Sequence, residues 1–371
     1  MQVSQIRWDH QSGWESLPSF STSAQLVLVF SDNPYFQEES CFNELREKFP
    51  QAQIIGCSSA GSIAGVSISD GDMIATVVQL EDANIRMVST DIGPGKNAQE
   101  VGEQLMSELA SPELRHVFVL SDGLHVNGSD LALGLNQAGL PVTGGLAGDG
   151  TRFGNTLVMA NAPAKTDRIV ALGFYGDLTI KSGCFSGCEE FGADRMVTKS
   201  IGNIVYEIDN QPALALYKKY LGEQASELPA SGLRFPLGIQ VNKKEKLLIR
   251  TLLGVDEGSN SLTFAGDVPQ GYLCKLMRTN SDLLIENAGM AADATHSQEQ
   301  YEAGLCLVVS CVGRRLVMGQ LTEEELEEVQ EKLGEKTTIA GFYSYGELAP
   351  FRDILQCQLH NQTMTLTTIY E

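Results

Sequence analysis

The chain has 371 residues, 43% of them apolar, which is enough for two or three domains with buried cores. Its 26 Lys and Arg against 47 Asp and Glu give a formal net charge of −21. An acidic surface of this kind repels nucleic-acid phosphates and anionic lipids, so we expect neither a nucleic-acid partner nor a membrane partner.

The amino terminus and the cysteines indicate a cellular compartment. The first sixteen residues lack the apolar core of a secretory signal, and apolar runs such as Leu26–Phe30 have only the length of a strand. Eight cysteines are spread along the chain without a CxxC pair. We therefore expect reduced, mostly buried thiols in a cytoplasmic protein.

Three segments repeat one pattern. Each begins with an apolar strand that ends in serine, continues through a helical stretch, and closes on a Gly-x4-Gly loop. A strand–helix–strand unit of this kind makes its two strands parallel, so the serines and the glycine loops emerge at one edge of a sheet, where open α/β sheets bind ligands. The strands are Leu26–Ser31, His116–Ser121 and Leu305–Ser310, the helical stretches 38–49, 129–138 and 323–333, and the loops 56–61, 145–150 and 341–346.

The segments around these units complete the expected fold. Thr322 and Glu325 form an S/T-x-x-E capping box for the third helix. We expect an α/β fold of mixed sheets with packed helices, in two domains (1–193 and 194–371) that share an interface. Each unit runs on into a hairpin-like pair of strands, 72–80 with 84–90, 155–161 with 168–174, and 354–359 with 364–369.

Cys311 suggests a nucleophile. It follows the third serine strand and precedes Arg314 and Arg315, whose charges would lower the pKa of the thiol. With Glu347 and His360 it would form the Cys-His-Glu set of a thiol-dependent hydrolase or acyl transferase. The alternative is structural: a buried cysteine, a histidine that satisfies a turn, and an Arg314–Glu347 ion pair.

Two histidines are candidates for a metal. The sequence has neither an HExxH nor a CxxCH motif, so neither a zinc-protease site nor covalently attached haem is indicated. Noncovalent haem needs only one good axial ligand and an apolar pocket. If haem is bound, His360 is the first axial candidate and His125, after the second serine strand, is the second.

Eight short motifs, in order over about residues 24–369, resemble the FIST family. They read GCSSAG, LSDG, GGLAGD, VTKSIGN, YEIDNQPAL, SCVGRR, AGFYSYGE and HNQT. The resemblance implies a FIST N-type domain over 1–193 and a FIST C-type domain over 194–371, acting as a sensory module for small ligands, with amino acids suggested. It also implies output through a histidine kinase or a cyclic-di-nucleotide signalling protein. A chain of FIST domains alone is similar to the haem proteins of the family that sense nitric oxide.

The resemblance also implies ligand-binding residues. We therefore expect a non-enzymatic sensor that signals to a separate partner, in which Arg314 and Arg315 take an anionic group such as a carboxylate or a haem propionate. The thiol enzyme and a structural adaptor that docks through the acidic surface remain the alternatives. The implied ligand-binding residues are Gly144, Gly145, Asp149, Ser310, Cys311, Arg314, Tyr343, Gly346, Glu347 and Asn361.

Overall fold

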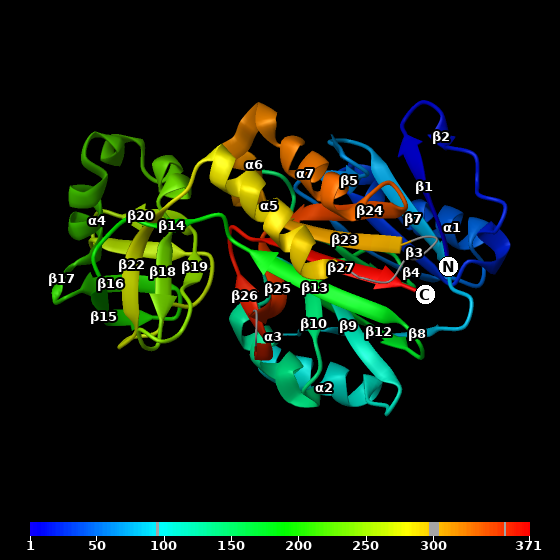
Figure 1. Ribbon diagram of the computed structural model, residues 1–371, viewed down its shortest axis with the longest axis horizontal. Helices are drawn as coiled ribbons and strands as arrows, with labels where there is room; N and C mark the ends of the chain where they lie inside the picture. The colour runs from blue at the N-terminus through cyan, green and yellow to red at the C-terminus, as the bar shows by residue number, and fades with distance from the viewer. Residues whose placement is uncertain (94–95, 297–303, 352–353) are drawn as a thin grey trace.

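The computed structural model in Figure 1 describes residues 1–93, 96–296, 304–351 and 354–371. It has two parts, which we call the body and the lobe. The lobe is the part from Glu189 to Arg278, and the body is formed by the chain before and after it. Both termini lie on the body, at the end away from the lobe (Figure 1). Among the described residues no helix is long and apolar enough to cross a membrane.

The first sheet of the body is built on the first repeat unit. Strands β3 and β4 run parallel, joined by α1, as the pattern predicts. The order of strands is β11-β4-β3-β7-β1-β2. The bounds are β1 (Gln2–Asp9), β2 (Gly13–Trp14), β3 (Leu26–Ser31), α1 (Glu39–Lys48), β4 (Gln53–Ser58), β7 (Met73–Gln79) and β11 (Val158–Ala160).

The second sheet is built on the second unit, with β9 parallel to β10 and α3 between them. The order of strands is β26-β25-β10-β9-β12-β8. The bounds are β8 (Asn84–Asp91), α2 (Ala98–Leu109), β9 (Leu114–Ser121), α3 (Gly128–Leu135), β10 (Val142–Leu146), β12 (Arg168–Tyr175), β25 (Gly346–Phe351) and β26 (Ile354–His360).

The third sheet is built on the third unit, with β23 parallel to β24 and two helices between them. The order of strands is β13-β27-β23-β24-β5-β6. The bounds are β5 (Ser62–Ala64), β6 (Ser67–Ser69), β13 (Thr179–Phe185), α5 (Ser281–Thr295), β23 (Gly304–Cys311), α6 (Val312–Met318), α7 (Glu324–Leu333), β24 (Thr337–Ser344) and β27 (Met364–Tyr370).

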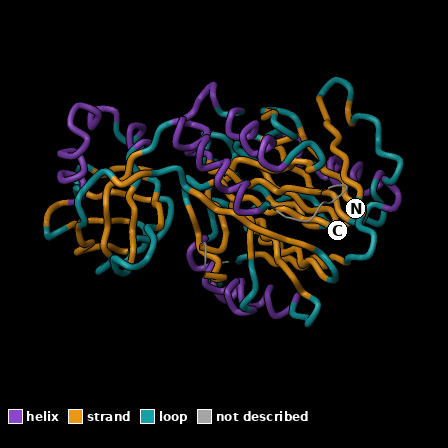
Figure 2. Tube along the Cα trace, in the orientation of Figure 1, coloured by secondary structure: helices purple, strands orange, loops and turns teal. Residues whose placement is uncertain are grey.

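The lobe is a separate antiparallel sheet of nine strands with one α-helix, α4 (Ala213–Leu221). Figure 2 shows it as a compact group of strands beside the body. Its strands are β14 (Glu189–Glu190), β15 (Arg195–Ile201), β16 (Ile204–Ile208), β17 (Gln211–Pro212), β18 (Leu237–Gln240), β19 (Leu248–Arg250), β20 (Leu252–Asp256), β21 (Ser261–Phe264) and β22 (Leu273–Arg278).

The three sheets of the body face one another across a single apolar core. Phe30 of the first sheet stacks on Phe342 of the third with ring centroids 4.8 Å apart, and Phe118 of the second sheet belongs to the same cluster. The serine strands β3, β9 and β23 are buried on both faces along almost their whole length. Helices cover their outer side: α1 packs on the first sheet, α2 and α3 on the second, and α5 and α7 on the third. This explains the near-continuous apolar runs of the serine strands.

The hairpin prediction is wrong for all three pairs of strands. β7 lies in the first sheet and β8 in the second, β11 in the first and β12 in the second, β26 in the second and β27 in the third. Strands β7, β12 and β27 are each bonded on both edges by other strands. Because both edges of these three strands are already paired, their sequence neighbours β8, β11 and β26 pair in an adjacent sheet.

The two halves of the chain are interleaved. β5 and β6 come from the first repeat unit but pair in the third sheet, and β25 and β26 come from the third unit but pair in the second sheet. The two halves thus share sheets as well as an interface. The division of the chain at residue 194 stays a prediction.

The expected capping box is also wrong. Thr322 donates its hydroxyl to the carbonyl of Gly319, and the first turn of α7 has no side-chain cap. Glu325 is fully buried and points into the body. Its carboxylate is used by an ion pair, as described below.

Candidate functional site

The three Gly-x4-Gly loops meet at the carboxyl ends of the parallel strands, as the repeat pattern predicts. Backbone hydrogen bonds join each loop to the others, so the loops pack on one another directly. The bonds between them join Ala60 to Tyr343 (2.8 Å), Gly148 to Ser58 (3.1 Å) and Tyr345 to Leu146 (3.1 Å).

The glycines singled out in the second and third loops allow close approach of neighbouring chain segments. Gly144 in β10 has φ +144°, and a Cβ there would lie 1.9 Å from the carbonyl oxygen of Val119. At Gly145 a Cβ would lie 2.5 Å from Val309. These two glycines therefore hold the second loop in place through close packing. Gly346, where a Cβ would lie 2.8 Å from Leu359, is packed in the same way.

Asp149 organises the chain that follows the second loop. Its carboxylate accepts the backbone N–H groups of Phe153 (2.9 Å), Gly154 (2.8 Å) and Asn155 (2.8 Å), and the hydroxyl of Tyr345. Burial opposes ionisation, but the hydrogen bond from Tyr345 and the three backbone bonds outweigh it and lower the pKa of Asp149. Asp149 therefore positions Phe153 and Tyr345, whose rings stack with centroids 4.6 Å apart.

Ser310, Arg314 and Tyr343 meet at one buried carboxylate, Glu325. Oε1 of Glu325 accepts the hydroxyls of Ser310 (3.0 Å) and Tyr343 (2.7 Å), and Oε2 accepts Nε (3.0 Å) and Nη2 (2.7 Å) of Arg314. Burial raises the pKa of the Tyr343 hydroxyl, which stays a donor. Sequence reasoning missed Glu325 because its spacing from Thr322 matched a helix cap.

Arg314 has no N–H group left for a ligand. Beyond Glu325 it donates to the carbonyl oxygens of Ser186 (3.2 Å), Gln362 (3.5 Å) and Leu284 (2.8 Å), so its five donors all have protein partners. The guanidinium is fully buried. The expectation that Arg314 takes an anionic group therefore has no donor to support it.

Arg315 is also engaged within the protein. Its guanidinium forms two hydrogen bonds with the carboxylate of Asp70 (2.8 and 2.6 Å) and donates to the carbonyl of Ala60 (2.6 Å). This pairing ties α6 to the first glycine loop and to the segment before β7.

Glu347 is a second buried carboxylate, in β25. It accepts the hydroxyls of Ser344 (2.6 Å) and Thr363 (2.8 Å) and the backbone N–H of Thr363 (3.2 Å). No cation of the described residues pairs with it, so the expected Arg314–Glu347 pair does not form. Burial raises the pKa of Glu347 to about 7, and the three hydrogen bonds only partly offset this.

The geometry does not activate Cys311. Burial raises the pKa of the Cys311 thiol, and the nearby charge of Glu347 raises it further, whereas Arg314 lowers it by less. The sequence-based expectation of a lowered pKa was wrong because it counted the arginines without the burial. His360 is buried too, its Nε2 lies 3.1 Å from the carbonyl of Ala349, and burial lowers the pKa of His360 to about 4.

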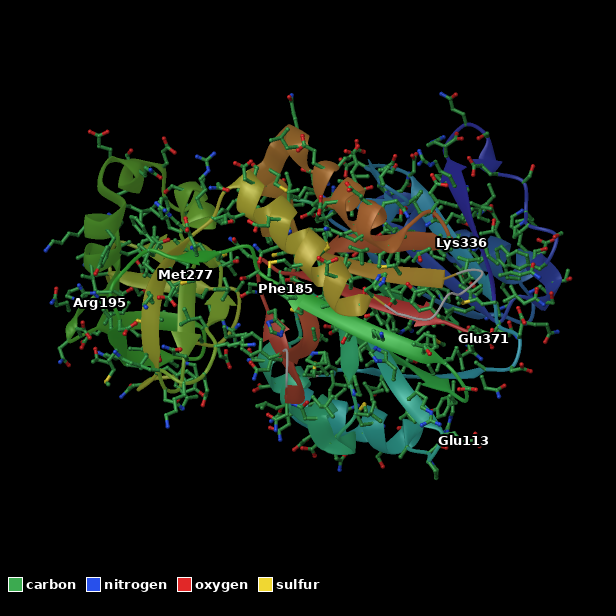
Figure 3. All side chains as sticks on the ribbon, in the orientation of Figure 1. Glu113, Phe185, Arg195, Met277, Lys336 and Glu371 are labelled. Atoms are coloured by element: carbon green, nitrogen blue, oxygen red, sulfur yellow. The ribbon has the colours of Figure 1, made fainter. Side chains whose placement is uncertain are left out.

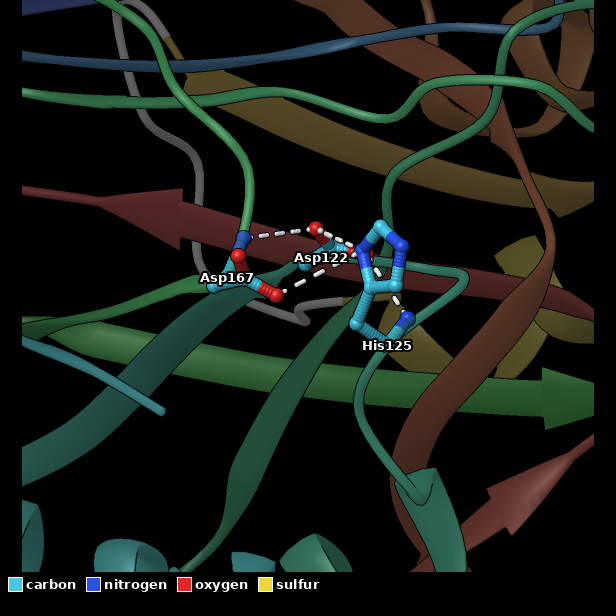
Figure 4. Close-up of side chains that lie close together, drawn as sticks. All are labelled: Asp122, His125 and Asp167. Atoms are coloured by element: carbon cyan, nitrogen blue, oxygen red, sulfur yellow. Dashed lines mark hydrogen bonds and ion pairs between the residues drawn. The ribbon is translucent and has the colours of Figure 1, made fainter. Parts of the chain in front are cut away.

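His125 lies in a polar cluster after β9, shown in Figure 4. Its Nδ1 is 3.0 Å from a carboxylate oxygen of Asp122 and 3.5 Å from one of Asp167. The hydrogen bond to Asp122 raises the pKa of His125. Asp122 is buried and also accepts backbone N–H groups of Leu124, His125 and Asp167 and the hydroxyl of Thr156. These protein donors occupy both of its oxygens, so the cluster orients the imidazole of His125.

A cavity of about 500 Å³ lies between the body and the lobe, at the ends of β9, β10 and β23. The first glycine loop does not line it. Its lining has apolar walls and a few polar groups, as is usual for small-molecule sites. The body contributes His125, Leu146, Phe153, Cys311, Val312, Leu316, Tyr345, Leu359 and Asn361, and the lobe contributes Asn203, Leu233, Thr251, Leu253, Phe264 and Asp267.

Two polar atoms in this lining have no partner. Among the described residues, three buried side-chain nitrogen or oxygen atoms make no hydrogen bond: Trp14 Nε1, Thr251 Oγ1 and Asn361 Oδ1. Thr251 is 4% exposed and Asn361 0%. Both line the same cavity, one from the lobe and one from the body. Buried polar groups are nearly always hydrogen-bonded, so two unpaired atoms on residues that line one cavity indicate a place for a ligand.

The sequence-derived residues thus fall into three groups. Cys311, Asn361 and the second metal candidate, His125, line the cavity. Gly144, Gly145, Asp149, Ser310, Arg314, Tyr343, Gly346 and Glu347 lie behind it, where they hold its walls, and His360 lines a neighbouring cavity. Sequence reasoning missed Thr251, a single threonine between two lobe strands, because no motif or spacing distinguishes it.

The chain is similar to one curated protein and to several solved structures. The uncharacterized protein MJ1623 of Methanocaldococcus jannaschii is 22% identical in an alignment that covers 89% of this chain and 70% of that protein. Among solved structures, a chorismatase covers 99% of this chain and 98% of its own at 9% identity and a TM-score of 0.37. A cyanuric acid hydrolase from A. caulinodans gives the same coverage, identity and TM-score. At these TM-scores the two structures carry no argument about this chain.

The family comparison is decisive. The FIST N domain matches residues 25–211 and the FIST C domain matches residues 213–350. Together the two matches span most of the chain, and FIST domains are known as small-ligand sensory domains. The chain therefore belongs to the FIST family.

Proposed function

We propose that this protein binds a small molecule in the cavity between the body and the lobe, and that binding changes the position of the lobe. The observation that carries the proposal is the pair of unpartnered buried atoms, Thr251 Oγ1 in the lobe and Asn361 Oδ1 in the body. Leaving such a group unpaired costs about 1–3 kcal/mol. A ligand that bonds both atoms removes this cost only while lobe and body are close together, so it favours the closed arrangement.

Arg314 supports a route from the lobe to the body. The carbonyl of Ser186 precedes the lobe and the carbonyl of Leu284 follows it, and both accept hydrogen bonds from this one guanidinium. Glu325 holds the guanidinium from α7. A movement of the lobe therefore acts on both connections at once and reaches α5, α6 and α7.

The proposed output is a separate protein partner in the cytoplasm. Membership of a family of sensory domains supports a signalling role, and a histidine kinase or a cyclic-di-nucleotide signalling protein is the proposed class of partner. The free, mostly buried cysteines agree with a reducing compartment.

Haem fits the cavity only in part. His125 has a suitable donor arrangement, because its Nδ1 faces Asp122 and Nε2 is the nitrogen left for iron. His360 does not, since its Nε2 lies against the carbonyl of Ala349. The described lining of the cavity contains no lysine or arginine to meet the propionates. We therefore leave haem, and with it nitric oxide, out of the proposed function; a Soret band in protein purified with haem supplied would reverse this.

A thermal-shift screen of small molecules tests the proposal. A ligand at 100 times its Kd stabilises a protein by about 2.7 kcal/mol. Thr251→Val removes the lobe hydroxyl and keeps the shape, and we expect it to weaken the affinity of any ligand found by roughly fivefold, the equivalent of one hydrogen bond. Thr263→Val in β21 is the matched control, because Thr263 lies in the lobe away from the cavity lining.

Unchanged affinity in two cavity variants would contradict the proposal. If every ligand found binds Thr251→Val and Asn361→Leu as tightly as the wild type, the cavity is not the binding site. Retained thermal unfolding midpoints in the two variants establish that they are folded.

A further inference from the structure

We propose that the ligand of this cavity is a small organic amine with an apolar body and no carboxylate or other anionic group. The inference rests on the proposed function and narrows it to a chemical class. It runs against the sequence-based expectation of an anionic ligand, and it is carried by the charges, the hydrogen-bonding capacity and the rings of the lining.

The charges around the cavity disfavour an anion. Among the described residues its lining has no lysine or arginine, whereas Asp267 lies on it and His125 stands with two carboxylates, Asp122 and Asp167. That cluster is negative even when the imidazole is protonated. The guanidinium of Arg250 lies behind Gly266 but donates to the carbonyls of Asp267, Ile249 and Leu359 and lines a neighbouring cavity. A buried carboxylate here would have no cation to pair with, which is costly.

The unpaired atom of Asn361 requires a donor. The Nδ2 of Asn361 donates to the carbonyl of His360 at 2.9 Å, and this fixes the orientation of the amide. The remaining Oδ1 is an acceptor and can be satisfied only by an N–H or O–H group. Thr251 Oγ1 can also accept. An ammonium group supplies three donors, which is enough for both atoms, whereas a carboxylate would repel Oδ1.

The rings on the body side suit a cation with an apolar body. Phe153 and Tyr345 stack at 17° between ring planes, and Asp149 accepts the Tyr345 hydroxyl. Aromatic faces attract ammonium groups and pack against apolar rings. Phe153, Leu253 and Leu316 are 50%, 47% and 44% exposed at the edge of the same cavity. A bound apolar group would cover these side chains.

A neighbouring cavity provides a contrast within the same molecule. It has about 510 Å³ and lies between Phe185 of the body and Met277 of the lobe, both labelled in Figure 3. Its lining includes three lysines and three acidic residues: Lys243, Lys246, Lys275, Glu190, Asp194 and Glu245. Lys243 and Lys275 pair with Asp194. A carboxylate ligand that binds between lobe and body has cations there, not in the cavity of Asn361.

Four probes with one phenyl-alkyl body separate the ligand classes: 2-phenylethylamine, 3-phenylpropanamide, L-phenylalanine and 3-phenylpropanoate. Calorimetric titration of the full chain measures their affinities. We expect the amine to bind most tightly, at least tenfold above the carboxylate, with the amide between them. Asn361→Leu and Thr251→Val should each weaken the amine at least fivefold, and Thr263→Val should leave it unchanged.

The result that overturns the inference is binding of the carboxylate or the amino acid at least as tightly as the amine, or no binding of the amine at all. The proposed function has its own criterion. To test it, a mixed fragment set of cations, neutral molecules and anions is titrated as well. The proposed function fails if none of these fragments binds Thr251→Val or Asn361→Leu more weakly than the wild type. If Asn361→Leu does not fold, Thr251→Val alone decides both questions.

Discussion

Arg314 and Glu325 form an ion pair without exposed surface, and neither partner could be recognised as such from the sequence. Arg314 stood in a motif that suggested anion binding, and Glu325 stood at the spacing of a helix cap. Burial reassigns both, since a buried guanidinium must find a carboxylate and enough carbonyls for its five donors. Motif residues can be found from sequence, but their partners depend on which side chains the fold buries together.

Removing one partner of this pair should be strongly destabilising. Arg314→Met leaves Glu325 buried without a cation, and we expect a loss of about 3–5 kcal/mol in the free energy of unfolding. Arg314→Met with Glu325→Leu should lose less than Arg314→Met alone, because no charge is left unpaired. Chemical denaturation of both proteins measures the difference, and equal or greater loss in the double variant would contradict the ion-pair account.

Glu347 makes stability depend on pH. Its folded-state pKa of about 7 lies above the 4.5 of the free side chain, so the folded state holds the proton more tightly. Stability contributed by this group is complete below about pH 4.5 and falls as the pH rises toward 7, by up to about 3 kcal/mol. Glu347→Gln should flatten the decrease between pH 5 and 8. His125, whose pKa is also raised, acts in the same direction and is unchanged in both proteins. Urea midpoints across this range measure the slope, and parallel curves would contradict the prediction.

At the scale of the elements, the repeat of serine strand, helix and glycine loop was visible in sequence and the pairing of later strands was not. Parallel pairing in each unit follows from the length of the crossover and from handedness. The partner of a strand such as β7 or β27 depends on which sheet edge is open in the folded body, and nothing in the local sequence records that. Asn361 was named as a ligand-binding residue through the family resemblance alone, because no local sequence pattern places it on a cavity wall.

Gly144 tests how tightly the second glycine loop is held. In Gly144→Ala the new Cβ would lie 1.9 Å from the Val119 carbonyl, and φ is +144°. Because the neighbouring β9 backbone cannot move without breaking its pairing, we expect a loss of at least about 2 kcal/mol. Gly254→Ala in β20 is the control, since nothing lies within 4 Å of its Cβ and its φ is not positive. Equal unfolding midpoints for the two variants would show that the loop is free to adjust.

At the scale of the whole molecule, each repeat unit gives strands to the sheet of another unit. The first unit gives β5 and β6 to the third sheet, the second gives β11 to the first sheet, and the third gives β25 and β26 to the second sheet. No unit can complete its own sheet alone. The body should therefore unfold as one cooperative structure, although its repeats suggest three separable ones.

Hydrogen exchange followed by mass spectrometry checks this. Peptides covering β11 and β25 should exchange as slowly as those covering β4 and β10, the strands they pair with. Peptides from the lobe are the internal comparison, because the lobe has its own core. Fast exchange confined to β11 or β25 would mean that the exchanged strands detach independently.

The links that carry the chain into and out of the lobe lie side by side. The hydroxyl of Thr279 on the outgoing link donates to the carbonyl of Gly187 on the incoming one at 2.7 Å. In topological terms the lobe is an insert at one point of the body, whose sheets it does not enter. Grafting the corresponding segment of another member at these links would replace Thr251 and its neighbours while Asn361 stays in place. Such an exchange would renew one wall of the cavity and leave the three sheets of the body as they are.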